Sequence, residues 1–301
     1  MKSLRISSRS NVLGALAFAS CAWLSTTASA DVKPYGKVPA DQAEVITTPD
    51  HLISVVRSGA PTAIWQALEH AEVVECMQCI TYVAPLIYDA NARNREIAAW
   101  WLRRRIFGVF GPGEVYQQTL NTLATDPSAT RRAYAAAAVG EFLVLPGIAA
   151  VATALTSDAD PGVRAASASA LGRLNDDGGG ALAKAFSDTD ATVRTAAFVA
   201  AGRINSFTDV ASAVAVTGDP DASVRRVGVE LLDAMVATDA AAAVLKLAQT
   251  DADSEVRLVA CHALGAIGDM SMTGALTELA ANDANLQVQD QAKIANIRLS
   301  R

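Results

Sequence analysis

In its C-terminal half the chain alternates between longer and shorter amphipathic stretches. In one long stretch Val163, Ala166, Ala170, Leu171 and Leu174 recur three and four residues apart, a spacing that places them on one face of a helix of about four turns. A turn (NDDGG) and a shorter apolar stretch (ALAKAFS) follow before the next aspartate. The pattern predicts antiparallel pairs of helices, one longer than the other.

The same unit recurs at a nearly constant spacing. Seven units can be recognised, and they begin at Asp89, Asp126, Asp158, Asp188, Asp219, Asp251 and Asp283. The last five aspartates lie 30, 31, 32 and 32 residues apart. Because one helix pair cannot bury its own apolar face, a repeat of this length is typical of units that stack on one another. We therefore predict an all-α fold, an α/α superhelical solenoid of stacked antiparallel helix pairs.

The second polar residue of each unit has a side-chain oxygen that can cap the following helix. The residues at this position are Asn91, Ser128, Asp160, Asp190, Asp221, Asp253 and Asn285. Pro161 follows its cap at the first helical position, where the missing N–H is not needed. Glycines also fall inside the longer helices, and small residues there let helix axes approach closely. They are Gly140, Gly172, Gly202 and Gly265.

The leading aspartate and an arginine six residues later form two regular series. The pairs are Asp158 and Arg164, Asp188 and Arg194, Asp219 and Arg225, and Asp251 and Arg257, with Asp126 and Arg132 and Asp89 and Arg95 in the weaker copies. The arginines could form an anion-binding row, but their fixed offset from an aspartate favours internal pairing.

With this pattern, residues 60–301 resemble the HEAT repeat family, in particular the short bacterial HEAT-like repeats of the phycobilisome (PBS) lyase type. The resemblance implies that the matching Asp and Arg form hydrogen bonds between adjacent repeats and have a structural role. The last copy has Gln289 in place of Arg, which is expected of a terminal cap.

The resemblance extends to an enzyme, deoxyhypusine hydroxylase, whose di-iron centre uses repeated His-Glu pairs. In this chain the histidines His51, His70 and His262 are followed by leucine or alanine, so that activity is not carried over. The chain also has no phosphate-binding glycine loop and no nucleophile-elbow motif. We expect a protein that is not an enzyme and that has no cofactor and no catalytic or metal site.

Residues 1–30 have the pattern of a signal peptide. A basic start precedes an apolar run from Val12 to Leu24 and the segment STTASA, whose small residues Ala28 and Ala30 predict cleavage before Asp31 and export, to the periplasm. We assign residues 31–59 to an N-terminal extension with a capping helix and residues 60–301 to the HEAT-like solenoid.

Two other interpretations of the leader are less favoured. Cys21 could be lipidated, but Phe18 stands where such a signal usually has leucine. A retained membrane anchor would need a longer uninterrupted apolar run. A second apolar stretch, residues 133–156, is broken by Pro146 and Gly147, so we predict two buried helices there and no membrane span in the mature chain.

Composition narrows the classes of partner. Apolar residues make up 51% of the chain, and the net charge is -6. Removal of the leader would leave 22 basic and 31 acidic residues. Nucleic acid requires a basic face, so this acidic balance argues against it as a partner.

The N-terminal third departs from the repeat. It contains Trp65, Trp100 and Trp101, and the consecutive arginines Arg103, Arg104 and Arg105. Trp and Arg are enriched at the energetic hot spots of protein interfaces, so we nominate Trp100, Trp101 and the three arginines as contacts for a partner. Adjacent residues of a helix point about 100° apart, so we expect one of the paired tryptophans in the core. Plain packing and solvation of this segment is the competing interpretation.

Cys76 and Cys79 are predicted at the first turn of a helix that continues through Tyr88. Three residues apart on a helix, they share a face and lie within range of a disulfide, which is the expected state in an exported protein. Redox-active or partner-linked thiols are an alternative. A metal site is another, for which only His70 and Glu75 are nearby candidates.

Taken together, these features predict a non-enzymatic exported scaffold that mediates protein–protein interaction with an unidentified protein partner. The alternative function is a periplasmic thiol-redox or electron-transfer accessory protein that uses Cys76 and Cys79.

Overall fold

The computed structural model describes residues 48–105 and 113–301. The predicted signal peptide, Cys21 and most of the predicted N-terminal extension lie outside these ranges. The described residues contain sixteen α-helices and no strand. The helices are α2 (Pro49–Ser58), α3 (Pro61–His70), α4 (Ile80–Val83), α5 (Ala92–Arg103), α6 (Glu114–Thr125), α7 (Ala129–Phe142), α8 (Ile148–Ser157), α9 (Pro161–Leu174), α10 (Ala181–Ala185), α11 (Ala191–Ala201), α12 (Val210–Val214), α13 (Ala222–Ala234), α14 (Ala241–Thr250), α15 (Ser254–Ile267), α16 (Thr273–Asn282) and α17 (Leu286–Leu299).

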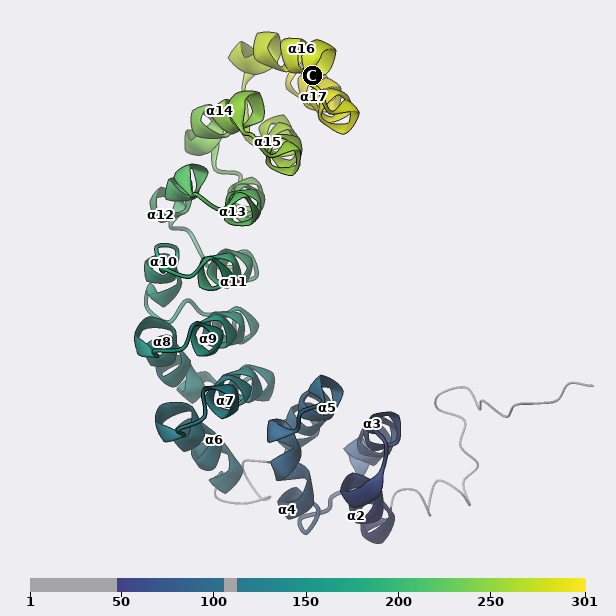
Figure 1. Cartoon of the computed structure of the whole chain (residues 1–301). Coiled ribbons are helices and arrows are strands. Elements are labelled where there is room, and N and C mark those ends of the chain that lie inside the picture. The colour runs from purple at the N-terminus through teal and green to yellow at the C-terminus, as the bar shows by residue number, and fades with distance from the viewer. Residues whose placement is uncertain (1–47, 106–112) are drawn as a thin grey trace, which may run out of the picture. The chain divides into compact units, whose positions relative to one another are not determined.

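From α6 onward the helices form two layers (Figure 1). The longer helices α7, α9, α11, α13, α15 and α17 each contact the next one in the series, and each also packs on the shorter helix that precedes it. Stacked helix pairs of this kind confirm the predicted all-α solenoid. None of the described helices combines the length and the apolar character that a membrane crossing requires. The apolar stretch 133–156 forms parts of α7 and α8, as predicted.

All seven predicted capping residues cap their helices. In each, a side-chain oxygen accepts a hydrogen bond from a backbone N–H two or three residues later, at 2.8–3.4 Å. These bonds satisfy N–H groups that have no partner inside the helix. Pro161 is the first residue of α9. The start of each long helix is therefore encoded locally.

Five bidentate arginine–aspartate pairs connect consecutive units, and we call them the Arg–Asp ladder. The pairs are Arg132–Asp158, Arg164–Asp188, Arg194–Asp219, Arg225–Asp251 and Arg257–Asp283. In each, Nε and Nη2 donate to the two carboxylate oxygens of the leading aspartate of the following unit, at 2.6–3.0 Å. The carboxylate partner of each arginine thus belongs to the next unit, 24–26 residues away.

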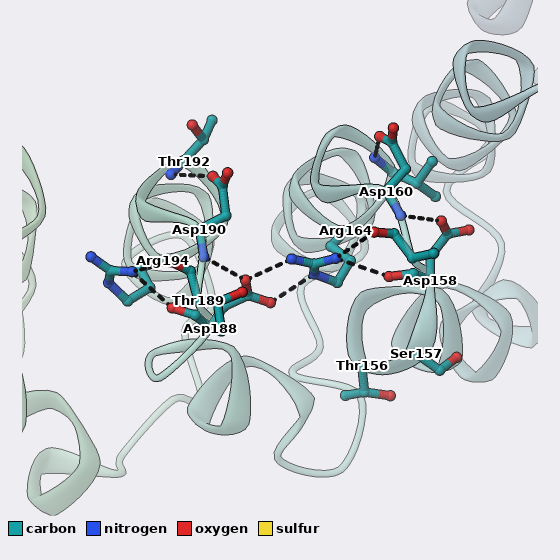
Figure 2. A network of polar contacts seen from close by, with 12 residues as sticks. Thr156, Ser157, Asp158, Asp160, Arg164, Asp188, Thr189, Asp190, Thr192 and Arg194 are labelled. Carbon is teal, nitrogen blue, oxygen red and sulfur yellow. Dashed lines mark hydrogen bonds and ion pairs between the residues drawn. The ribbon is translucent and has the colours of Figure 1, made fainter.

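Each ladder arginine also binds its own unit. Figure 2 shows Arg164 between Asp158 and Asp188. Its Nη1 donates to the backbone carbonyl oxygen of Asp158 at 2.9 Å, and Oδ1 of Asp188 accepts from the backbone N–H of Asp190 at 2.9 Å. Because bidentate pairs have a defined geometry, this arrangement fixes the position of one unit on the next. At the last unit Gln289 Nε2 keeps only the bond to the Asp283 carbonyl oxygen.

The ladder changes the acidity of its carboxyl groups. Hydrogen bonds from the arginines lower the pKa of Asp158 and Asp283, while burial acts in the opposite direction. For Asp188 and Asp251 the largest single influence is burial, which raises the pKa. The hydrogen bonds from arginine and from the backbone together lower the pKa by more, so the net pKa lies below its usual range. Asp158, Asp188, Asp251 and Asp283 are therefore ionised at neutral pH.

Gly140 and Gly172 lie where the backbones of neighbouring long helices touch. A Cβ atom on Gly140 would lie 2.9 Å from the Cα atom of Ala170, and one on Gly172 would lie 2.9 Å from the Cα atom of Ala200. At Gly202, by contrast, no atom would lie closer than 3.7 Å, because the facing residue is Leu231. Glycine is therefore needed for backbone contact at the first two positions and not at the third.

We expect Gly172→Ala to lower the free energy of unfolding by about 1–3 kcal/mol, because the new methyl group overlaps a backbone atom. Gly202 has helical backbone angles, and the methyl group of an alanine there would overlap no neighbouring atom. Gly202→Ala is therefore the matched control and should be neutral or stabilising by up to about 1 kcal/mol. Urea unfolding followed by far-ultraviolet circular dichroism measures both. Equal effects of the two substitutions would contradict this account of the helix contacts.

We expect Asp158→Asn to remove charge-assisted hydrogen bonds and to lower the free energy of unfolding at pH 7 by about 1–3 kcal/mol. The folded-state pKa of Asp158 is lowered, so its stabilisation is present above the unfolded pKa of about 3.9 and is lost as the pH falls through the folded value. Between pH 5 and pH 2 the variant should consequently lose less stability than the wild type. Urea titrations across that pH range would show parallel curves if the ladder carboxylate contributes nothing.

Candidate partner-binding face on α3 and α5

Two of the five nominated contact residues are buried. Trp101 is fully buried and its Nε1 donates to the Ala71 carbonyl oxygen at 3.1 Å. Arg105 is 4% exposed. The prediction that these two residues contact a partner is therefore wrong, since neither side chain reaches the surface. The expectation that one of the adjacent tryptophans lies in the core holds, because Trp100 is only partly buried.

Arg105 has a structural role that its place in an arginine run conceals. Its guanidinium donates to the carbonyl oxygens of Ala71, Glu72, Val74 and Trp101, and it lies over the Trp101 ring at 3.9 Å. Burial, followed by the charge of Arg104, lowers the pKa of Arg105 to about 10. The carbonyl groups beyond the end of α3 would otherwise lack hydrogen-bond donors. Arg105 therefore connects the end of α3 to the end of α5.

The other three nominated residues reach the surface of α5. Arg104 is exposed and forms an ion pair with Glu72, in the segment that follows α3. Trp100 and Arg103 are partly exposed. Glu96, Trp100 and Arg103 are spaced four and three residues apart, so they occupy one face of the helix.

This face continues onto α3. Thr62, Trp65 and Gln66 of α3 and Arg93 and Glu96 of α5 line a cleft of about 350 Å³. Trp65 is partly buried, and its Nε1 donates to Glu69 at 3.1 Å. We define the α3–α5 face by five residues that this geometry brings together. They are Trp65, Arg93, Glu96, Trp100 and Arg103.

Charged groups of α7 and α9 border the face. Glu141 of α7 forms an ion pair with Arg173 of α9. Burial raises the pKa of Glu141; Arg173 and Arg103 lower it, and Glu96 raises it further. Glu96 and Arg103 therefore lie near enough to Glu141 to affect its pKa. Arg93 and Arg103 themselves form no ion pair with any described residue.

Arg93 and Glu96 were not among the contact residues predicted from the sequence. Their spacing could have identified them, because they continue the helical face of Trp100 and Arg103 at intervals of three and four residues. Trp65 lies on α3 and is distant in sequence from Arg93. Only the packing of α3 on α5 shows that both residues line the same cleft.

The two cysteines form a disulfide with an S–S distance of 2.04 Å and a Cα–Cα distance of 5.3 Å. Both are buried, Cys76 at 3% and Cys79 at 0% exposure. They lie in a turn that precedes α4, and the predicted first helical turn at this place is wrong, as is a single helix through Tyr88. α4 ends at Val83 and a 3-10 helix, η2 (Ala84–Tyr88), follows, because Pro85 has no N–H to continue the α-helical bonding.

The remaining candidate ligands do not gather around the cysteines. His70 Nδ1 lies 2.7 Å from the Gln66 carbonyl oxygen. Across the described part of the chain, no three His, Cys, Asp or Glu side chains are grouped so that they could hold a metal ion.

The folds of YibA and Kap95p are similar to that of this chain. The Escherichia coli protein YibA aligns with a TM-score of 0.59 and 19% identity over 89% of this chain and all of that chain. Kap95p, in a structure concerned with its binding to RanGDP, aligns with a TM-score of 0.57 and 14% identity over 84% of this chain and 40% of that chain. The CpcE–CpcF complex of phycocyanin lyase from Nostoc aligns with a TM-score of 0.40 and 19% identity over 72% of this chain and 86% of that chain.

A search of curated protein sequences finds no match. The family model for HEAT repeats matches residues 116–202 and 208–295. These segments cover more than half of the chain and coincide with the units joined by the Arg–Asp ladder. The chain belongs to the HEAT repeat family.

Proposed function

We propose that this protein is an exported, non-enzymatic HEAT-repeat scaffold whose α3–α5 face binds another protein. The HEAT-repeat fold is compatible with protein–protein interaction, and Kap95p, which shares the fold, is described as binding RanGDP. The proposal of export rests on the signal-peptide pattern of residues 1–30. Shared positions of the repeat are used for stacking, so recognition belongs to the positions that differ between units.

One observation carries the choice of this face. Two partly exposed tryptophans, Trp65 and Trp100, stand beside Arg93 and Arg103, neither of which has an ion-pair partner among the described residues. Tryptophan and arginine supply most of the binding energy at many interfaces because they combine large contact area with several donors. Two arginines against the single carboxylate Glu96 favour a partner segment that presents an acidic residue next to an apolar one.

The alternative redox function is less well supported by the cysteine geometry. Thiol–disulfide exchange requires attack on an accessible sulfur, whereas Cys76 and Cys79 are both almost completely buried. Their bond closes the turn between the segment after α3 and the start of α4. We therefore propose a structural role for the disulfide, with no exchange partner.

The first test combines Trp100→Ala with Arg103→Glu. Loss of a hot-spot side chain and reversal of one charge should weaken partner capture from periplasmic extract at least about tenfold, with normal circular dichroism. Arg226→Glu is the matched control, since Arg226 is a surface arginine on α13, paired only with Glu230. Capture that survives the double substitution but fails in the control would place the binding surface elsewhere. Arg105 is left unchanged because its loss would unfold the α3–α5 connection.

The second test replaces Cys76 and Cys79 together by alanine. Loss of this short cross-link should lower the free energy of unfolding by about 2 kcal/mol, chiefly through the entropy of the unfolded chain. Partner capture should be retained. If the folded double variant lost its partner instead, the thiol-redox function would be favoured over the scaffold.

A further inference from the structure

The Arg–Asp ladder is missing at one junction, between α5 and α7. The residues for it are present, because Arg95 and Asp126 stand at the ladder positions of their units. Asp126 nevertheless accepts from Arg131 of its own unit, with Nε and Oδ2 2.9 Å apart. Arg95 keeps its bonds to the carbonyl oxygens of Asp89 and Ala90, and its guanidinium lies over the Tyr134 ring at 3.8 Å.

Arg131 stands where the later units have a buried valine. Five residues after the leading aspartate, these units carry a valine with 0% exposure in every case, and the residues are Val163, Val193, Val224, Val256 and Val288. Arg131 is exposed instead, and its guanidinium also lies over the Tyr88 ring at 4.3 Å. The position that is buried in the later units thus carries an exposed arginine here, and this arginine binds Asp126 in place of Arg95.

Asn94 occupies the same position in α5. It is 5% exposed, and its Oδ1 has no hydrogen-bond partner among the residues that the structure describes. A buried polar atom without a partner weakens the packing around it. Both units at this junction therefore lack the valine that packs the helix pairs further along the chain.

Packing is also looser at this junction. Arg103 stands at the position that Gly140 and Gly172 occupy in the following units, so the close backbone contact seen there is lost. A groove of about 580 Å³ lies between η2 and α6. The buried side chains divide into two clusters, one over Leu52–Phe142 and one over Leu123–Ala295. The first cluster includes Tyr116 of α6 and Ala138 and Phe142 of α7, so these three side chains are the part of the core that crosses the junction. Further along, Asp233 also replaces the glycine, but the Arg225–Asp251 bridge remains intact there.

We propose that residues 48–105 form a module that opens independently of the remaining stack, and that Arg131 creates the joint by diverting Asp126 from Arg95. Cooperative units in proteins open separately where few interactions cross between them. Long repeat arrays are especially prone to this behaviour because each unit touches only its neighbours. The joint goes beyond the proposed function, since it concerns the coupling of the module that bears the α3–α5 face and needs no partner to be tested.

Native-state hydrogen exchange on the full mature chain, read by mass spectrometry, tests the joint. Amides of α3 and α5 should exchange through a common opening that is at least about tenfold more populated than the opening that exposes α9 to α15. Exchange of both regions through one opening with equal protection would overturn the proposal.

Arg131→Val tests the cause. It restores the buried valine and frees Asp126 for Arg95, so exchange of α3 and α5 amides should slow about tenfold, the effect expected of one charge-assisted bridge. Arg226→Val is the control and should leave exchange in α3 and α5 unchanged. No slowing in a folded Arg131→Val variant would overturn the assignment of Arg131.

Adding Asp126→Asn to Arg131→Val separates the bridge from the packing of the new methyl groups. Return of α3 and α5 exchange to the wild-type rate supports the Arg95–Asp126 bridge. Slowing that persists in the double variant would show that valine packing alone is responsible, and the proposed diversion of Asp126 would then be wrong. These measurements are made without a partner, so they can fail while the binding function stands.

Discussion

The bidentate contact between an arginine and the leading aspartate of the next unit is the interaction on which the stack depends. Each ladder arginine holds a carbonyl oxygen of its own unit and a carboxylate of the following one, and that carboxylate is itself held by a backbone N–H. Partly buried charges are tolerated here because their hydrogen-bonding groups are satisfied. Hydrophobic burial drives the units together, and the ladder defines how they sit on one another.

The features that distinguish this chain arise where the repeat is altered. Trp101 stands in the position that Ala170 and Ala200 occupy in later units, and Arg105 stands where Phe142 ends α7. Both side chains are used to bind carbonyl oxygens beyond α3, so the N-terminal helices are joined by a different set of contacts. The surface left over on α3 and α5 carries the two partly exposed tryptophans and the two arginines that pair with no carboxylate in the described part of the chain.

Local features of the fold could be predicted because they depend on residues close in sequence. Helix starts follow from caps such as Asp160 and from Pro161, and the pairing of helices follows from the period of the aspartates. The candidate site could be predicted only in part. Trp100, Arg103 and Arg104 reach the surface as expected. The next residue, Arg105, is buried because the carbonyl oxygens that accept its hydrogen bonds belong to residues 71–74.

The sequence by itself determined that the chain is all helical, that the helices come in repeated pairs, and where the helix caps stand. These properties follow from spacing and from the short-range chemistry of side chain and backbone. The family resemblance implied bonds between adjacent repeats, but only the tertiary structure decided that Arg164 binds both carboxylate oxygens of Asp188. It also decided that Arg131 takes Asp126 from Arg95 and that Trp65 shares a cleft with Arg93. In the first two cases, groups of suitable chemistry compete for one partner, and the distance between helices selects among them. In the third, the packing of α3 on α5 brings together residues that are far apart in sequence.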